Sequence, residues 1–201
     1  MLRLAPTLLL LHACTGVTVR ESATDGEAAY KIRAEALSAI HEWGLVGRIS
    51  LDDGDDGGSG KLRWNVDAQG SELDFRGAMG RGAWHLSLGP EGAVLQEANG
   101  VESRAPDVNA LIHQRLGWPL PLDALQWWVR GLVAPGAVVT KQVSNTGTLV
   151  ALQQYDWSIT FKRYTTSSGV ALPARLEAKR DNYRIKLALT TWHVDMGAGS
   201  E

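Results

Sequence analysis

The stretch LVGRISLDDGDDGGSGKLRWNVDAQGSELDFR, residues 45–76, decides the fold class of this chain. Apolar and polar residues alternate in three short runs, 45–51, 61–67 and 72–76, and segments rich in Gly, Asp and Ser separate them. Alternation with a period of two predicts half-buried strands, and Gly and Asp between such runs are typical of hairpin turns. The stretch therefore predicts an antiparallel meander.

The same alternation continues toward the C-terminus. Further strands are predicted at 82–88, 92–98, 100–104, 138–143, 147–153, 156–164, 170–180 and 183–194. The sum is roughly ten strands. This number indicates a mainly β (α+β) domain, a single antiparallel β-barrel or a strongly curved sheet, with helices that cover one side.

Two helices interrupt the meander. In PDVNALIHQRLG a helix opens after Pro106 and closes at Gly117, and in PLDALQWWVRG a helix opens at Pro121 and closes at Gly131. Proline in the first turn and glycine just past the last turn are typical helix boundaries.

Another helix is predicted ahead of the meander, from Thr24 or Asp25 to about Trp43, with Gly44 as its stop. Its apolar positions recur at helical spacing: Ile32, Ala36, Leu37, Ile40 and Trp43. Such a helix has one apolar face and needs a sheet or a cavity to pack on.

The composition bounds the function. The chain has 201 residues, a formal net charge of −2 and no dominant block of like charge, which argues against nucleic-acid binding. It has eight tryptophans, and large rings of this kind suit half-buried strands and the walls of an internal cavity.

Motifs of common catalytic and metal sites are missing from the sequence. GDDGGSGKL resembles a phosphate loop, but Asp55 stands at its first glycine and Leu62 at its hydroxyl position. A calcium loop that starts at Asp53 would need a glutamate where Trp64 stands. No Gly-x-Ser-x-Gly elbow is present, and no two histidines have metal-binding spacing. We therefore expect no enzyme, no metal and no cofactor.

The N-terminal stretch TLLLLHACTG, residues 7–16, predicts export. Arg3, a short apolar core and a small residue before a cut site are typical of a secretory signal, and the core is far shorter than the ~20 residues of a membrane span. An ordinary signal would leave the single cysteine, Cys14, without a role.

Leu11, Ala13 and Cys14 resemble the lipobox of bacterial lipoproteins. The resemblance implies cleavage before Cys14, lipid attachment to its thiol and, with Thr15 next, the outer membrane. The predicted organisation is a signal peptide at 1–13, a lipidated cysteine with a flexible tether at 14–24, and one domain at 25–201.

Several stretches resemble, in order, the LolB family of outer-membrane lipoproteins. They are WGLVGRIS (43–50), GAMGRG (77–82), GWPLPLDALQWWVRGLVAP (117–135), YDWSITFKRY (155–164) and LPARLEAKRDNYRIKLALTTW (172–192). The resemblance implies an incomplete, strongly bent barrel whose opening is plugged by helices, with a hydrophobic cavity for acyl chains. It implies a monomeric receptor, lipid-anchored in the outer membrane and facing the periplasm, that takes acylated lipoproteins from the carrier LolA and inserts them into outer-membrane lipid.

The resemblance also implies roles for residues. In the loop Ala78, Met79 and Gly80, the apolar side chain of Met79 would enter the bilayer, although Ala78 replaces the family's proline. A plain hairpin turn with Met79 folded inward is the alternative. The acyl cavity would be lined by Trp64, Phe75, Leu125 and Trp128.

Three other functions stay open at this point. A generic lipid-binding lipoprotein would bind free lipid and ignore the carrier. An envelope structural subunit would have a filled core. A hydrolase would need a polar cluster within the cavity.

Overall fold

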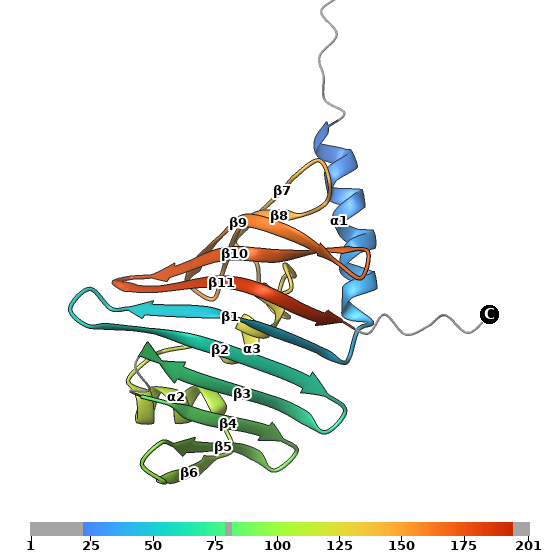
Figure 1. Ribbon diagram of the computed structural model, residues 1–201. Helices are drawn as coiled ribbons and strands as arrows, with labels where there is room; N and C mark the ends of the chain where they lie inside the picture. The colour runs from blue at the N-terminus through green and yellow to red at the C-terminus, as the bar shows by residue number, and fades with distance from the viewer. Residues whose placement is uncertain (1–21, 79–81, 195–201) are drawn as a thin grey trace, which may run out of the picture.

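The computed structural model describes residues 22–78 and 82–194, which form a large antiparallel sheet with helices against it (Figure 1). The sheet has 11 strands in the order β6-β5-β4-β3-β2-β1-β11-β10-β9-β8-β7. Strands β6 and β7 are its two borders, so the sheet formed by the described residues is not closed. This confirms the mainly β fold predicted from the alternating runs and the incomplete, strongly curved antiparallel barrel that the family resemblance implies.

The helices are α1 (Ser22–Ser38), α2 (Val108–Leu116) and α3 (Leu122–Trp128). The strands are β1 (Trp43–Asp52), β2 (Gly57–Asp67), β3 (Gly70–Gly77), β4 (Trp84–Gly89), β5 (Gly92–Glu97), β6 (Glu102–Ala105), β7 (Thr140–Val143), β8 (Leu149–Gln154), β9 (Trp157–Ser167), β10 (Val170–Arg180) and β11 (Tyr183–Val194). Each strand overlaps one of the predicted alternating runs.

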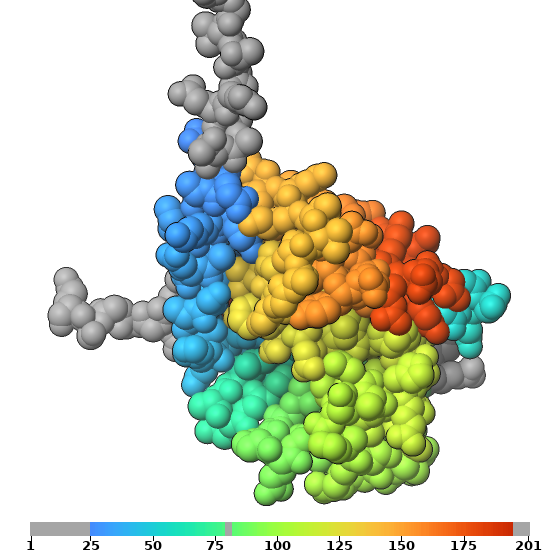
Figure 2. Space-filling view, turned by 180° about the vertical axis from the view of Figure 1, so that it is seen from behind, coloured from blue at the N-terminus to red at the C-terminus, as the bar shows by residue number. Residues whose placement is uncertain are grey.

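The sheet has two distinct ends, because its strands are antiparallel. The connections β1–β2, β3–β4, β5–β6, β8–β9 and β10–β11 lie at one end, which we call the loop end. The connection from α1 into β1 lies at the other, which we call the α1 end (Figure 1). The chain between β6 and β7, with α2 and α3, covers the back of the sheet, the side that faces the viewer in Figure 2.

The ends of α2 and the first hairpin are as predicted. The Asp107 carboxylate accepts from the Ala110 N–H at 2.8 Å and caps the start of α2, while Gly117 ends it at φ 74°. In the β1–β2 turn, Asp53 Oδ1 accepts from the N–H groups of Asp55 and Asp56, which makes the acidic segment a turn.

The predicted extent of the first helix is wrong. Helix α1 ends at Ser38, and Trp43 begins β1, opposite Val66 and Val194. Ile32 does not lie on a buried face, because it is 70 % exposed, whereas Leu37 is buried. Trp43 fits the helical spacing of apolar residues and is buried, which favoured the longer helix. It is buried as a strand residue, however, with its ring 5.4 Å from that of Trp64.

Arg130 binds the chain at the C-terminal end of α1. Its side chain is buried, and its Nη1 donates to the carbonyl oxygens of Leu37 (3.2 Å) and Ile40 (3.4 Å). The last carbonyls of a helix have no partner within the helix, and a cation there is favourable. The guanidinium also lies 4.9 Å from the ring of Trp127. Burial lowers the pKa of Arg130 to about 10.

A second arginine fixes the middle of α1. The Arg33 guanidinium donates to the carbonyl oxygens of Gly131, Arg130 and Ala171 at 2.7–3.0 Å. It therefore joins α1 both to the chain after α3 and to the start of β10. Burial lowers the pKa of Arg33.

The borders of the sheet are short. Strands β6 and β7 have four residues each, α2 packs beside β6, and α1 packs beside β7. Within the described residues, no helix is long and apolar enough to cross a membrane.

Candidate functional site

Half-buried aromatic rings gather at the loop end of the sheet. Phe75 on β3 stacks on Trp84 on β4, with ring centroids 5.3 Å apart. Gly60 on β2 makes room for this pair, because a Cβ there would lie 2.6 Å from the Phe75 ring. Trp118 lies edge-on to Tyr183 at the start of β11, at 6.3 Å. This end thus presents apolar surface at the rim of the core.

A pocket of about 230 Å³ opens beside these rings, and we call it the lower mouth pocket. Its apolar lining is Leu51, Phe75, Trp84, Leu116 and Trp118. Gly82, the first described residue after the β3–β4 loop, also lines it. Of the stretch GAMGRG, residues 77–82, Gly82 therefore lies at an apolar pocket.

A second pocket at the loop end, of about 480 Å³, lies between α3 and the ends of β9 and β10, and we call it the upper mouth pocket. Its apolar lining is Pro121, Ala124, Trp127, Ala134, Pro135, Tyr155 and Trp157. Arg180 places a positive charge at its wall, with the guanidinium 5.5 Å from the Trp157 ring. Asn109, Asp123 and Gln126 add polar groups. Such a site suits an apolar ligand with a polar head.

The wall of the upper mouth pocket includes an unused hydrogen-bond donor. Trp157 is 1 % exposed, and its Nε1 has no partner among the described residues. The neighbouring Trp128, with its ring 6.5 Å away, donates from Nε1 to Gln154 Oε1 at 3.1 Å. A buried donor without a partner costs stability, so the hydrogen-bonding groups of this wall are less well satisfied than those of the core beside it.

The four predicted cavity residues do not lie together at a pocket. Trp64, Leu125 and Trp128 are 1 %, 2 % and 0 % exposed and lie within the packed core. Phe75 is half-buried and lines the lower mouth pocket. Contact of these residues with acyl chains stays a prediction.

Several predicted residues cannot be placed. Cys14, Met79 and Gly80 lie outside the described residues, as do the signal peptide 1–13 and most of the tether 14–24. Ala78 follows the end of β3 and is exposed.

Sequence reasoning missed most of the mouth residues. It selected Trp128, but the adjacent Trp127 lines the upper mouth pocket, because the position of the sheet decides which side of α3 is covered. Arg130, which binds the end of α1 rather than the mouth, could have been singled out from the sequence, since it is the only basic residue in the apolar stretch 117–135.

A hydrogen-bonded relay of Asp74, His85 and Ser87 lies on the outer face of the sheet. His85 Nδ1 is 3.0 Å from Asp74 Oδ1, and His85 Nε2 is 3.0 Å from Ser87 Oγ. These distances match a serine-hydrolase triad, but such an enzyme also needs free N–H donors beside the nucleophile. Ser87 lies in the middle of β4, in register with Glu72 of β3 and Val94 of β5. Because β4 is paired with a strand on each side, its backbone N–H groups are used by the sheet. We assign no catalysis to this relay.

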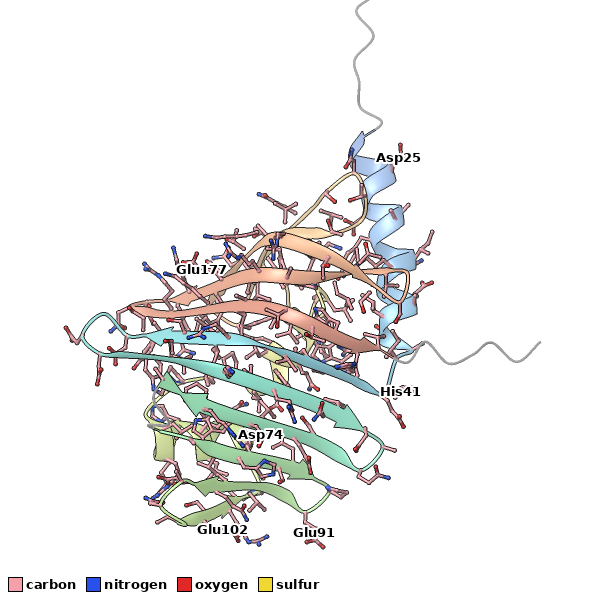
Figure 3. The ribbon with its side chains drawn as sticks, viewed as in Figure 1. Asp25, His41, Asp74, Glu91, Glu102 and Glu177 are labelled. Carbon is pink, nitrogen blue, oxygen red and sulfur yellow. The ribbon has the colours of Figure 1, made fainter. Side chains whose placement is uncertain are left out.

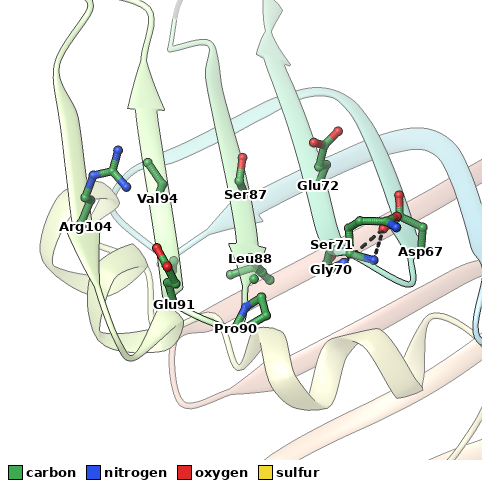
Figure 4. A pocket seen from close by; sticks show the side chains of 14 residues that line it. Asp67, Gly70, Ser71, Glu72, Ser87, Leu88, Pro90, Glu91, Val94 and Arg104 are labelled. Carbon is green, nitrogen blue, oxygen red and sulfur yellow. Dashed lines mark hydrogen bonds between the residues drawn. The ribbon is translucent and has the colours of Figure 1, made fainter.

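Another hollow, of about 660 Å³, lies at the α1 end between the β2–β3 and β4–β5 turns (Figure 4). Its side chains include Asp67, Glu72, Glu91 and Arg104. This charged lining does not suit an acyl chain. In the described part of the chain, no three His, Cys, Asp or Glu side chains are close enough to hold a metal ion.

The chain matches the family model described as "Outer membrane lipoprotein LolB" over residues 41–192. It is 36 % identical over 192 residues to the outer-membrane lipoprotein LolB of Pseudomonas paraeruginosa, covering 94 % of this chain and 93 % of the relative. It is 32 % identical over 185 residues to the protein of the same name from Alkalilimnicola ehrlichii, with 92 % of both chains covered.

Solved structures share the fold. A LolA superfamily protein from Nitrosomonas europaea superposes with a TM-score of 0.52 at 9 % identity, over 90 % of this chain and 94 % of that one. A putative outer membrane lipoprotein-sorting protein domain from Vibrio parahaemolyticus superposes with a TM-score of 0.51 at 10 % identity, over 88 % of this chain and 95 % of that one. At these identities the likeness is one of fold.

Proposed function

Because this chain belongs to the LolB family of outer-membrane lipoproteins, we propose that it receives acylated lipoproteins from the periplasmic carrier LolA and inserts them into the outer membrane. In this proposal it is a binding and transport factor, not an enzyme. Cys14 carries its lipid anchor, and the domain faces the periplasm.

The observation that carries the proposal is the apolar mouth at the loop end. Two pockets open there, with half-buried rings of Phe75, Trp84 and Trp118 at one and Trp127 at the other. Monomeric soluble surfaces rarely gather aromatic rings in this way unless they bind something. Each acyl CH₂ group that leaves water gains ~0.8 kcal/mol, so pockets of this kind suit acyl chains.

Transfer of the lipoprotein needs no nucleotide if each successive binding site, from carrier to receptor to bilayer, binds the acyl chains more tightly than the site before. In this scheme the mouth accepts the chains, and the lipid bilayer is the final and most favourable site. Met79, three residues before Gly82 of the lower mouth pocket, is the residue we propose to touch the bilayer. A flexible thioether suits an apolar contact of this kind.

The test uses photocrosslinking in vesicles that hold the lipidated chain. A photoreactive phenylalanine derivative replaces Trp127 in the upper mouth pocket, Trp84 in the lower one, or Ile32 on the exposed face of α1 as the matched control. Carrier loaded with an acylated lipoprotein is added, and cargo crosslinks are counted after illumination. We expect crosslinks at Trp127 and Trp84 and none above background at Ile32.

The same samples test delivery. The vesicles are sedimented, and we expect cargo to leave the carrier for the pellet in the presence of the chain. Met79→Glu should retain the crosslinks and lose the delivery, whereas Met79→Leu should retain both. If cargo stays on the carrier while the mouth still binds free fatty acid, the chain is a generic lipid-binding lipoprotein and the proposal is wrong. If the mouth binds neither, a structural role replaces it.

A further inference from the structure

A row of cations crosses the outer face of the sheet. Arg175 on β10, Arg48 on β1, Lys61 on β2 and Arg76 on β3 fall in one line of cross-strand partners, with Ala188 of β11 between the first two. All four charged side chains are exposed. Residues opposite each other in an antiparallel pair point to the same face, so this row is a single charged line.

Arg48, Lys61 and Arg76 are consecutive neighbours in this row and carry like charges. Within the described residues, none of the three makes an ion pair within 4.0 Å. Like charges directly opposite one another destabilise a sheet. The row therefore opposes folding and indicates a use other than stability.

A second group of cations lies beside the row. Glu177 on β10, labelled in Figure 3, is largely buried. Its carboxylate oxygens lie 2.7 Å from Lys162 Nζ, 3.3 Å from Lys179 Nζ and 3.4 Å from Arg184 Nε. Lys186 is its cross-strand partner. One carboxylate thus gathers three cations in fixed positions, and the group keeps a net positive charge.

We call these eight residues the basic band: Arg48, Lys61, Arg76, Lys162, Arg175, Lys179, Arg184 and Lys186. Acidic residues on the same face lie at its margins, with Asp52 in register with Arg184 and Asp74 bound to His85. The chain as a whole has a net charge of −2, so the band is a strong local asymmetry. The sequence hides it, because on each strand these cations alternate with buried apolar residues.

We propose that the basic band docks on the anionic phospholipid headgroups of a bilayer and thereby sets the orientation of the domain on the membrane. Strands lie about 4.8 Å apart, so the row from β10 to β3 spans roughly 20 Å and faces several headgroups at once. Lys and Arg near an anionic lipid surface are attracted additively. The long side chains keep their charges at the headgroup level.

This inference rests on the membrane location in the proposed function but not on transfer of cargo. A bilayer is the occupant we choose, since a lipid-anchored domain has that surface always within reach. Docking of this kind supplies orientation without deep insertion.

The test measures which face lies on the bilayer. Because Cys14 is the only cysteine and the anchor occupies it, a cysteine at Ala188, in the centre of the row, takes a fluorophore alone. Ile32→Cys on α1 is the control label. The lipidated full chain is placed in vesicles of phosphatidylethanolamine alone, or with phosphatidylglycerol at a ratio of about 3 to 1, both with headgroup nitroxide as quencher.

We expect the Ala188 label to be quenched at least about fivefold more in the anionic vesicles than in the neutral ones, and the difference to disappear in about 0.5 M salt. Arg48→Gln with Lys61→Gln should abolish the difference. The matched pair Lys31→Gln with Arg115→Gln removes the same charges from helices α1 and α2, away from the outer face of the sheet, and should leave it unchanged. Circular dichroism confirms that both double variants fold.

Three results would overturn the proposal. They are equal quenching on both kinds of vesicle, equal loss in the two double variants, and quenching of the Ile32 label in place of Ala188. Cargo crosslinking at Trp127 is measured in the same samples, so loss of docking with intact crosslinking separates this proposal from the function itself.

Discussion

The two ends of the sheet use similar residues in opposite ways. At the α1 end, Arg33 and Arg130 are satisfied by backbone carbonyl oxygens, and the junction of helix, insert and strand is closed around them. At the loop end, aromatic rings are only half covered, Arg180 lies at a pocket wall, and Trp157 keeps an unused donor. Satisfied buried charges thus concentrate at one end and accessible apolar surface at the other. Ligand-binding regions are generally drawn from the less stable part of a fold.

The largest expected effect is at the α1 end. Arg130→Met removes the buried donor to the carbonyl oxygens of Leu37 and Ile40, and we expect it to lower the free energy of unfolding by ~3–4 kcal/mol, measured by urea denaturation. Arg180→Met is the same change at the loop end, where the side chain is 33 % exposed. It should cost less than ~1 kcal/mol. Equal costs at the two ends would break the comparison.

A second pair of variants tests how closely α1 is held. Gly147, in the β7–β8 turn, has φ 76°, and a Cβ there would lie 2.5 Å from the carbonyl carbon of Ala29 on α1. Gly169 has φ 77° but open space around its Cα. Gly169→Ala should therefore cost only the strain of the left-handed backbone, ~1 kcal/mol. Gly147→Ala should cost ~2–4 kcal/mol, because the helix must also shift.

Hydrogen exchange of the α1 amides gives a local readout for the same pair. Gly147→Ala should lower the protection of α1, and Gly169→Ala should leave it unchanged. Unchanged protection in both would mean that α1 does not depend on this close approach.

A smaller effect separates the two tryptophans that lie side by side. Trp128→Phe and Trp157→Phe remove similar volumes, but only the first breaks a described hydrogen bond, to Gln154. We expect Trp128→Phe to cost ~1 kcal/mol more than Trp157→Phe in thermal or urea unfolding. The reverse order would mean that the donor of Trp157 is satisfied, and that the loop end is as well paired as the core.

The smallest effect appears at alkaline pH. Tyr164 donates its hydroxyl to the Leu149 carbonyl oxygen at 2.9 Å, and burial raises its pKa above the usual range. A raised folded pKa means that this group stabilises the fold fully below the unfolded pKa of about 10, and that the contribution is lost as pH rises further. Between about pH 9 and pH 11, the free energy of unfolding, measured by urea denaturation, should therefore fall by ~1 kcal/mol less in Tyr164→Phe than in the wild type.

The sequence predicted the sheet well for local reasons. Most strands are bounded by turn residues, and Asp107 and Gly117 cap α2 as predicted. The predicted end of the next helix at Gly131 is wrong, because α3 ends at Trp128 with Val129 at its C-cap. The limit of α1 was not predictable, because Ile40 and Trp43 fit helical spacing and Arg130, distant in the chain, binds its C-terminal end. A local pattern cannot contain a partner that is 90 residues away.

The site was harder to predict than the fold. The sequence marks large rings, but which ring lines a pocket depends on how far the sheet curves over it. Trp64 was selected and is packed in the core, while Trp84 and Trp118 line a pocket. The β8–β9 turn was predicted, but nothing in the sequence indicated that its Tyr155, at φ 52°, would reach the upper mouth pocket.

The short borders of the sheet have a consequence for a protein that handles other polypeptides. An open sheet presents unpaired N–H and C=O groups along both margins, and these can template the addition of a foreign strand. Here each margin is only four residues long and has a helix beside it. A partly unfolded cargo chain, or a neighbouring copy on the same membrane, could therefore form only a few backbone hydrogen bonds with either edge strand. The sheet can therefore remain open as a barrel while both of its edges resist the addition of a foreign β-strand.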